Sequence, residues 1–231
     1  MKYTTVLMDA DETLLDFRRS EREAVSEMLE IFGIRPDEEI IKKYSEINSS
    51  LWKALERGEI EKKVLFYHRF ELLSKAYGFS FDAKEMAKTY MDILAEKGYM
   101  LDGALELCKK LQGKVRLYIV TNGAEYIQRG RYKILGIEKY FDGIFISDSI
   151  GYEKPSVEFF EAIIKDIEDF SKDSTIIVGD SLSSDMQGGI NFGIDTCWYA
   201  PNAERIPDGM DITYHARSHE EIYDFITRKG E

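Results

Sequence analysis

The sequence Asp9-Ala-Asp-Glu-Thr13 is the first place along the chain where residue types and spacing could support chemistry. It directly follows the apolar residues 3–8, which have the composition of a buried strand. Side chains two positions apart in an extended chain point the same way, so Asp9 and Asp11 can face one target. Two such carboxylates could bind a cation, attack an electrophile or transfer protons. The alternative is a polar strand end, with Thr13 as the N-cap of the next helix.

Thr121-Asn122-Gly123 follows another apolar run and precedes a predicted helix. A hydroxyl group and successive backbone N–H groups at a helix N-terminus can bind an oxyanion such as phosphate. The same residue types are common in turns and caps, so a structural role is the alternative. Lys154-Pro155 has a similar place after a strand-like run, although a lysine before a proline is usually an exposed loop residue.

A fourth motif, Gly179-Asp-Ser-Leu-Ser-Ser-Asp185, follows the apolar residues Ile176–Val178. It places Asp180 at the end of a predicted strand and Asp185 in the first turn of the helix that follows. A capped helix start would explain the same residues without any function. Each motif alone is therefore weak, and their relative positions in the fold decide the interpretation.

Six apolar runs of strand length recur along the chain, and helix-length segments separate them. The runs cover residues 3–8, 115–120, 143–147, 175–178, 194–199 and 212–215, and the segments between them include predicted helices at 124–135 and 157–167. Pro155 just before one helix and Gly136 just after another are typical start and stop signals. The alternation of strand and helix predicts an α/β protein with a parallel, doubly wound sheet.

Residues 16–98 differ from the rest of the chain because they contain no strand-like run and carry apolar residues at helical spacing throughout. One such stripe comprises Leu65, His68, Leu72 and Ala76. We therefore expect an all-helical cap, inserted after the first strand into a discontinuous sheet domain formed by 1–15 and 99–231. A connection that leaves the carboxyl end of the first strand would place this cap over the crevice where open α/β sheets bind ligands.

Residues from all four motifs fall at the predicted carboxyl ends of strands, which converge in a doubly wound sheet. They are Asp9, Asp11, Thr121, Lys154, Asp180 and Asp185. Carboxylates about 4 Å apart repel each other by roughly 4 kcal/mol at an effective dielectric constant of about 20, so such a cluster needs a cation. Oxygen ligands without His or Cys select a hard ion, and we expect Mg²⁺.

A hard cation, a lysine and a threonine with backbone N–H groups together suit a phosphoryl group. Attack by Asp9 on phosphorus would give an aspartyl-phosphate, while Asp11 would protonate the leaving oxygen and then deprotonate water. Uncatalysed hydrolysis of phosphate monoesters is so slow that enzymes accelerate it by up to ~10²¹-fold. The residues therefore predict a Mg²⁺-dependent phosphomonoesterase.

With these motifs in this order, the chain resembles the haloacid dehalogenase superfamily of phosphohydrolases along its whole length. The resemblance implies that Asp9 is the nucleophile and a Mg²⁺ ligand, and that Asp180 is the other carboxylate ligand. It implies that Asp11 is the acid/base, whose backbone carbonyl also binds the metal. Residues 16–98 would correspond to the helical cap of that superfamily.

The same resemblance gives the remaining motif residues supporting roles. Asp185 would order the groups that surround the metal, and Thr121 and Lys154 would hold phosphate oxygens. Asn122 and Gly123 would complete the substrate site next to Thr121.

Within this superfamily the sequence is most similar to bacterial house-cleaning 5′-nucleotidases that act on pyrimidine nucleoside monophosphates. The similarity rests on the Asp-Ala-Asp-Glu-Thr form of the first motif and on matches elsewhere in the chain. These are Asn48 with Leu51-Trp52, Arg69-Phe70-Glu71, Thr121-Asn-Gly123, and residues 188–193 leading into Thr196-Cys-Trp198. Two departures are Glu12, where many relatives have glycine, and Leu101-Asp-Gly103, which lacks a common proline.

Aromatic and polar residues of the expected cap could bind a base. Trp52 could stack on the ring and Arg69 could meet its polar edge, so both are candidate substrate-binding residues. Aromatic residues at helical spacing more commonly belong to a core, which is the alternative for Trp52. We interpret His68, on an apolar stripe, as structural, and neither His215 nor His219 has neighbours that suggest metal ligation.

Other functions of the phosphoryl-transfer type fit the same motifs. A phosphatase for phosphoglycolate or a phosphosugar, and a phosphosugar mutase, would keep all four and differ mainly in the cap. A dehalogenase would not need Asp11, because no leaving oxygen has to be protonated. A signalling receiver domain forms an aspartyl-phosphate without turnover, but its acidic pair precedes a separate phosphoacceptor, whereas here the candidate nucleophile, Asp9, lies on the first strand.

The composition of the chain restricts its partners. It has 31 Lys and Arg against 43 Asp and Glu, and the net charge of −12 would repel nucleic-acid polymers and anionic membranes. No apolar run approaches the ~18 residues of a membrane span, and Cys108 and Cys197 indicate neither a disulfide framework nor a cysteine metal site. We expect a cytoplasmic enzyme for a small phosphorylated metabolite, as a monomer or a small homo-oligomer.

Overall fold

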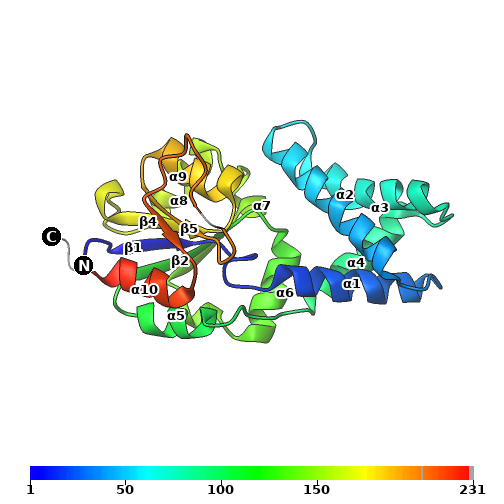
Figure 1. Cartoon of the computed structure of the whole chain (residues 1–231), viewed down its shortest axis with the longest axis horizontal. Helices are drawn as coiled ribbons and strands as arrows, with labels where there is room; N and C mark the ends of the chain where they lie inside the picture. Colours follow the sequence, from blue (N-terminus) through cyan, green and yellow to red (C-terminus); the bar gives the residue numbers. More distant parts are fainter. Residues whose placement is uncertain (204, 229–231) are drawn as a thin grey trace.

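The computed structural model describes residues 1–203 and 205–228, so residues 204 and 229–231 of the expected sheet domain lie outside the described residues. Within the described ranges, six strands form one parallel sheet in the order β3-β2-β1-β4-β5-β6 (Figure 1). They are β1 (Thr5–Met8), β2 (Arg116–Thr121), β3 (Gly143–Ile146), β4 (Thr175–Gly179), β5 (Asp195–Tyr199) and β6 (Tyr214–Ala216). The order reverses between β1 and β4, as in a doubly wound sheet, and the predicted fold class is confirmed.

Strand β1 lies inside the sheet and pairs with β2 on one side and β4 on the other. All four of its residues are buried, as expected for an uninterrupted β-branched and apolar run. Met8 lies level with Ile119 and Val178, and the next residue, Asp9, donates its backbone N–H to Val178 O at 2.8 Å. The segments that follow β1, β2 and β4 therefore begin at nearly the same level of the sheet.

Helices cover both faces of the sheet (Figure 1). One face packs against α5 (Ala104–Leu111), α6 (Glu125–Leu135) and α10 (His219–Thr227), and the other against α8 (Val157–Ile163) and α9 (Gln187–Phe192). Alternate residues of β1 divide between the two faces, with Val6 and Met8 on the first and Leu7 on the second. The shorter elements are α7 (Ser147–Ile150), η1 (Glu138–Tyr140), η2 (Ile164–Asp166), η3 (Lys172–Ser174) and η4 (Leu182–Met186).

Residues 17–95 form a helical lobe beside the sheet (Figure 1). Its helices are α1 (Phe17–Ile31), α2 (Glu38–Glu56), α3 (Lys62–Tyr77) and α4 (Ala83–Ala95). The lobe has its own core, which includes the rings of Tyr44, Phe70 and Tyr90 with centroids 5.4–5.5 Å apart. Ala124 and Ile127, at the start of α6, also belong to this core, so the helical lobe packs against the sheet domain at α6.

Acidic side chains cap three helices of this lobe. Asp16, Asp37 and Asp82 accept hydrogen bonds from backbone N–H groups at the starts of α1, α2 and α4. The N-cap of α1 is therefore Asp16, and the interpretation of Thr13 as the cap is wrong.

The stripe predicted on residues 65–76 is only partly correct. Leu65 is buried as expected, but His68, Leu72 and Ala76 are not, and the other buried residues of α3 are Arg69, Phe70 and Leu73. His68 Nδ1 lies 2.7 Å from Glu71 Oε2 at the surface. Because α3 packs against both α2 and α4, a single stripe does not describe its buried surface.

Two segments that run side by side connect the helical lobe to the sheet. Leu101 N donates to Leu14 O at 2.9 Å, which joins the segments directly. The ring of His219, at the start of α10, lies across both, with Nε2 2.8 Å from Thr13 O and Nδ1 2.8 Å from Asp102 O. The C-terminal helix thus holds the connection, and His219 has this structural role.

Cys108 lies in α5 and Cys197 in β5, and both are buried and unpaired. No helix in the described part of the chain combines the length and the apolar character that crossing a bilayer requires.

The contact between α4 and α6 should not tolerate a side chain at position 130. A Cβ at Gly130 would lie 2.5 Å from the backbone oxygen of Ala95. We expect Gly130→Ala to lower the free energy of unfolding by about 1–3 kcal/mol, because the two helices would have to move apart. Urea denaturation measures this change, with Lys133→Ala on the exposed side of α6 as the control. Equal midpoints for both variants would contradict this account of the contact.

Candidate active site

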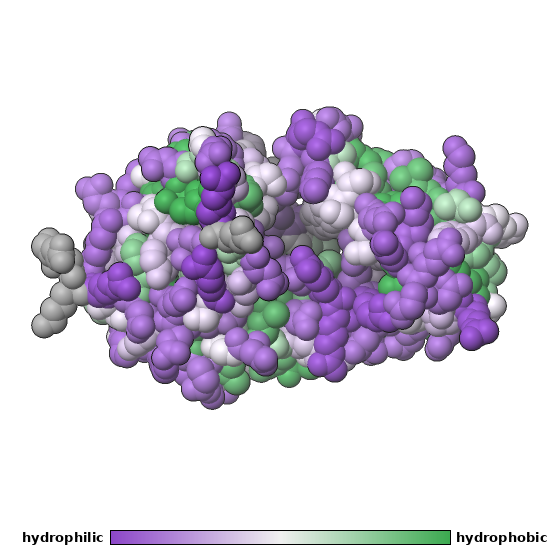
Figure 2. Space-filling model, viewed as in Figure 1, coloured by the Kyte–Doolittle hydropathy of each residue, from purple (hydrophilic) through white to green (hydrophobic). Residues whose placement is uncertain are grey.

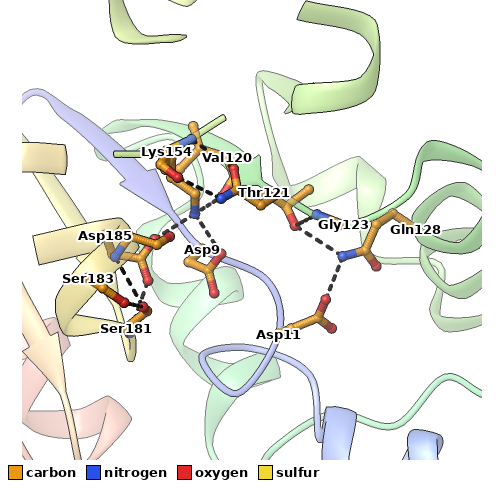
Figure 3. A network of polar contacts seen from close by, with 12 residues as sticks. Asp9, Asp11, Val120, Thr121, Gly123, Gln128, Lys154, Ser181, Ser183 and Asp185 are labelled. Carbon is orange, nitrogen blue, oxygen red and sulfur yellow. Dashed lines mark hydrogen bonds and ion pairs between the residues drawn. The ribbon is translucent and has the colours of Figure 1, made fainter. Parts of the chain in front are cut away.

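Lys154 lies at the centre of the site and is 1% exposed. Its Nζ donates hydrogen bonds to Asp9 Oδ1 at 2.7 Å, to Asp185 Oδ1 at 2.6 Å and to Val120 O at 2.8 Å (Figure 3). All three donors of the ammonium group are thus used within the protein. The interpretation of Lys154 as an exposed loop residue is wrong, because two carboxylates compensate its charge in the interior.

Three carboxylates from different parts of the chain meet next to Lys154. One oxygen atom from each of Asp9, Asp180 and Asp185 lies within 4.8 Å of the others. Asp9 follows β1, and the other two follow β4, so neighbouring strand ends bring them together. The set offers oxygen ligands only, which is the chemistry that suits a hard divalent cation.

The carboxyl groups are crowded beyond what Lys154 compensates. Burial raises the pKa of Asp9 to about 7, and the charge of Asp185 adds to this while Lys154 opposes it. Burial and then the charge of Asp9 raise the pKa of Asp180 to about 9. Burial by itself would lower the pKa of Lys154, but the charges of Asp185 and Asp9 outweigh it and raise that pKa. The site therefore attracts a further positive charge.

Donors of the protein hold both oxygens of Asp185. Oδ1 is bonded to the buried ammonium group, and Oδ2 accepts a hydrogen bond from the backbone N–H of Ser181 at 3.1 Å. Gly179 is required beside it, since a Cβ at that position would overlap Asp185 Oδ2. In the same segment, Trp198 Nε1 donates to the backbone oxygen of Asp180 at 2.8 Å. The segment after β4 is therefore fixed from two sides.

Thr121 ends β2, and its hydroxyl group lines the site. Oγ1 accepts hydrogen bonds from Gly123 N at 3.0 Å and from Gln128 Nε2 at 3.1 Å. With these bonds filling its acceptor positions, the hydroxyl group retains its hydrogen for donation. Asn122 exchanges two hydrogen bonds with the backbone of Lys154, at 2.8 and 2.9 Å, so its side chain fixes the Lys154 loop.

The carboxyl group of Asp11 lies apart from the Asp9 cluster, on the side of α6 (Figure 3). It accepts a hydrogen bond from Gln128 Nε2 at 2.7 Å and forms an ion pair with Arg131. Arg131 is fully buried and also donates to Lys97 O, near the end of α4, at 3.2 Å. This residue therefore connects the predicted acid/base to the junction with the helical lobe.

Gln128 and Arg131 belong to the site although no sequence motif indicates them. Their spacing of three places them on one face of α6, next to the buried Ile127 and Tyr132. Both are polar residues on the buried face of a helix that follows a possible phosphate-binding loop, and this pattern could have indicated them.

A cavity of about 610 Å³ separates the motif residues from the helical lobe, and Figure 2 shows the hollow between the two parts. Asp9, Asp180 and Lys154 line one side of it. The helical lobe lines the other side with residues that include Phe17, Asn48, Trp52, Phe66 and Arg69. Both of the cap residues proposed from the sequence, Trp52 and Arg69, thus line the cavity, whose volume is typical of small-molecule sites.

Glu12 lines the same cavity in a left-handed backbone conformation, with a φ of 59°. That conformation is unfavourable for residues other than glycine. The side chain compensates, because Oε1 accepts a hydrogen bond from Arg18 N at 2.8 Å and Oε2 lies 3.1 Å from Arg18 Nε. Burial raises the pKa of Glu12, while the bond from Arg18 opposes this shift. Glu12 therefore ties the first motif to the start of α1.

Side chains near the turn between α2 and α3 contact the sheet side across the cavity. Lys62 Nζ donates to Ser147 Oγ at 2.8 Å and forms an ion pair with Asp148. Ser183 Oγ donates to Glu56 Oε2 at 2.7 Å. No sequence motif indicated these contacts, which hold the helical lobe over the motif residues.

Comparison with known proteins agrees with this geometry. Residues 3–193 match the family model of haloacid dehalogenase-like hydrolases. The chain belongs to this family. The superfamily resemblance predicted from the four motifs is thereby confirmed, and the hydrolase has a six-stranded parallel sheet across the residues that the structure describes.

Three curated relatives of the hydrolase match almost its whole length. The pyrimidine 5′-nucleotidase PynA of Streptococcus pneumoniae is 37% identical over 99% of this chain and 97% of its own. YfnB of Bacillus subtilis is 36% identical over 97% of this chain and 96% of its own, and the pyrimidine 5′-nucleotidase YjjG of Escherichia coli is 28% identical over 99% and 100%. A crystal structure of YfnB bound to magnesium, which reveals interdomain movement in that protein, superposes with a TM-score of 0.93 over 99% of this chain and 100% of that one, at 35% identity.

Removal of one crowded carboxylate should stabilise the metal-free hydrolase at high pH. The pKa of Asp180 is raised in the folded protein to about 9 from 3.8, so the folded state keeps a proton that the unfolded chain loses. The stabilisation from this proton is complete below about pH 4 and is lost as pH rises through about 9. Asp180→Asn removes that dependence. We expect it to raise the free energy of unfolding by about 2 kcal/mol at pH 9 and by less at pH 6.

Urea denaturation in the presence of EDTA at both pH values measures the effect. Asp166→Asn changes an exposed aspartate outside the site and is the matched control. If Asp180→Asn raised the free energy of unfolding equally at pH 6 and pH 9, the raised pKa of Asp180 would be contradicted.

Proposed function

We propose that the hydrolase is a Mg²⁺-dependent phosphomonoesterase that works through an aspartyl-phosphate, and that its substrates are ribo- or deoxyribo-pyrimidine nucleoside 5′-monophosphates. The observation that carries the proposal is the buried Lys154, which holds Asp9 beside Asp180 in a cavity that extends to the helical lobe. PynA and YjjG support the substrate class, because both are named pyrimidine 5′-nucleotidases and cover nearly all of this chain.

The donor set of the site fits Mg²⁺. The carboxylates of Asp9 and Asp180 and the backbone carbonyl of Asp11 would hold the ion, and Asp185 would order the groups around it. When bound, the ion would supply positive charge next to the phosphate oxygens, in the place where the raised pKa values of Asp9 and Asp180 indicate an excess of negative charge.

The residues of the site suit the first displacement. An oxygen of Asp9 attacks phosphorus, the ester P–O bond breaks, and its electron pair goes to the leaving oxygen, which Asp11 protonates. Lys154 orients the Asp9 carboxylate through its hydrogen bond to Oδ1. Thr121 is placed to donate its hydroxyl hydrogen to a phosphate oxygen. The products are the free alcohol and the phosphorylated aspartate.

The second displacement releases phosphate. A water molecule attacks phosphorus while Asp11 takes its proton, and the bond between phosphorus and Asp9 breaks, which restores the carboxylate. Gln128 and Arg131 hold the Asp11 carboxyl group on the α6 side of the cavity in both steps. The same carboxyl group thus serves as acid and then as base.

The organisation of the chain supports the same function. We assign residues 1–15 and 99–231 to the catalytic domain and residues 16–98 to a cap that closes the cavity and selects the substrate. A phosphoglycolate would leave most of a cavity of about 610 Å³ unfilled, whereas a nucleotide extends to the aromatic residues of the cap. The two unpaired cysteines suit a reducing compartment, and we propose the cytoplasm as the place of action.

Replacement of the nucleophile should abolish turnover and leave the fold intact. Asp9→Asn retains the size of the side chain but removes the attacking carboxylate, so we expect the kcat for p-nitrophenyl phosphate to fall at least ~10³-fold. Phosphate release measures the rate, circular dichroism checks the fold, and Asp166→Asn is the control. Turnover within a few-fold of wild type would remove Asp9 as the nucleophile.

The substrate profile tests the proposed nucleotidase. With Mg²⁺ present, we expect kcat/KM for pyrimidine monophosphates to exceed that for phosphoglycolate and phosphosugars by at least ~10-fold, because only a nucleotide contacts both sides of the cavity. Purine monophosphates complete the series of substrates. EDTA should abolish all of these activities, and Mg²⁺ should restore them. A preference for a substrate without a base would reject the nucleotidase, and full activity in EDTA would reject the metal.

A further inference from the structure

A polar cluster lies inside the helical lobe, and the proposed chemistry does not use it. It consists of Glu21 on α1, Ser45 and Asn48 on α2, and Arg69 on α3. Ser45 Oγ donates to Glu21 Oε2 at 2.9 Å, and Asn48 Nδ2 donates to Glu21 Oε1 at 2.6 Å. Arg69 Nη1 donates to Asn48 Oδ1 at 3.1 Å. Glu21, Asn48 and Arg69 are buried, with Asn48 and Arg69 only 3% and 2% exposed, whereas Ser45 lies at the exposed edge of the cluster. Burial of the three polar groups is costly unless they are hydrogen-bonded.

The neighbours of Asn48 fix the orientation of its side-chain amide. A guanidinium group only donates hydrogen bonds, so the atom that faces Arg69 must be the oxygen Oδ1. The nitrogen Nδ2 then faces the carboxylate of Glu21, which accepts its bond. Asn48 is thus held in one orientation, and it keeps one N–H donor and one acceptor position that these two bonds do not use.

The cluster also has a donor without a partner. Arg69 Nη2 is buried and makes no hydrogen bond with any residue that the structure describes. A buried donor left in this state typically costs about 1–3 kcal/mol, so native proteins rarely retain one without a reason. Glu21, Ser45, Asn48 and Arg69 all line the same cavity as the motif residues. A ligand in the cavity that offers acceptor atoms would complete the cluster.

The position of Asn48 along α2 sets the length of such a ligand. Ser45, Asn48, Trp52 and Glu56 line the cavity from one face of α2, and Glu56 contacts Ser183 in the segment that follows β4. Glu56 lies eight positions after Asn48, which corresponds to about 12 Å along the helix axis. A ligand with its phosphate group beside Asp9 therefore needs an extended body to reach Asn48 across the cavity, and a glycolate lacks one.

The surroundings of the cluster indicate a planar group. The side chains of Phe17, Trp52 and Phe66 line the cavity together with Asn48. Aromatic side chains pack well against flat, partly apolar rings, and one oriented amide can pair with a ring edge that carries a donor beside an acceptor. Both uracil and cytosine carry such an edge at N3 and the adjacent exocyclic atom.

We propose that Asn48, held in one orientation by Glu21 and Arg69, recognises the N3 edge of the pyrimidine base. This inference rests on the proposed nucleotidase function and adds the residue that determines its specificity. Arg69 acts in two ways, because it orients Asn48 through Nη1 and its Nη2 is available to an exocyclic oxygen of the base. Glu21 and Ser45 are positioning residues, since their bonds act on the base only through Asn48.

A substrate that lacks the N3 edge tests the proposal on the unmodified enzyme. Uridine 5′-monophosphate and its N3-methyl derivative have the same phosphate, sugar and ring, but the methyl group blocks the edge. We expect kcat/KM for the methylated substrate to be at least 10-fold lower, mainly through a higher KM. Equal kcat/KM for the two substrates would overturn the role of Asn48 and leave the nucleotidase standing.

Variants of Asn48 locate this discrimination in the helical lobe. Asn48→Leu should lower kcat/KM for uridine 5′-monophosphate 10- to 100-fold and bring the two substrates to within about 2-fold of each other. Asn48→Asp, which retains the shape and the bond from Arg69, should show the same loss of discrimination if the leucine variant does not fold. Ser50→Ala, an exposed change on the same helix, should leave both values unchanged.

The outcomes separate the two proposals. Variants of Asn48 that fold and still discriminate against the methylated substrate would overturn the inference alone. A wild-type enzyme that hydrolyses p-nitrophenyl phosphate but no pyrimidine nucleotide would overturn the proposed function, and the inference with it.

Discussion

The active site depends on two ion pairs, which the ammonium group of Lys154 forms with the carboxylates of Asp9 and Asp185. All three groups are buried, and none could remain charged in the interior without the others. Because these residues come from three distant segments, their ion pairs also fix how the strand ends of the sheet are aligned. One positive charge does not balance the carboxylates present, and the same arrangement therefore orients Asp9 and leaves an excess of negative charge beside it.

The sequence was sufficient to predict the sheet and the placement of its polar residues. Uninterrupted apolar runs identify parallel strands because both faces of such strands are buried, and β1 and β4 lie where these runs predict them. Since parallel strands share one direction, polar residues that follow them must meet at one edge. This pattern alone was enough to predict that Asp9 and Asp180 lie close together, as they do.

Other parts of the site depend on packing that a single sequence does not contain. The roles of Gln128 and Arg131 follow from the rotation of α6 against β1, which brings this face of the helix to Asp11. The predicted buried stripe of α3 was only partly correct, because that helix packs against both α2 and α4. Trp52 and Arg69 could be proposed as substrate-binding residues from the sequence. The bonds that orient Asn48 could not, because they join residues of three different helices.

The position of β1 has a consequence for how the protein is made. Thr5 pairs with Arg116 on one side and with Thr175 on the other, so the first strand to leave the ribosome lacks both neighbours until much of the chain has been synthesised. The helices of residues 17–95 pack mainly against one another and can assemble in the meantime. A chain that stops before Asp180 therefore has all four helices of the lobe but lacks two of the three carboxylates that meet beside Lys154.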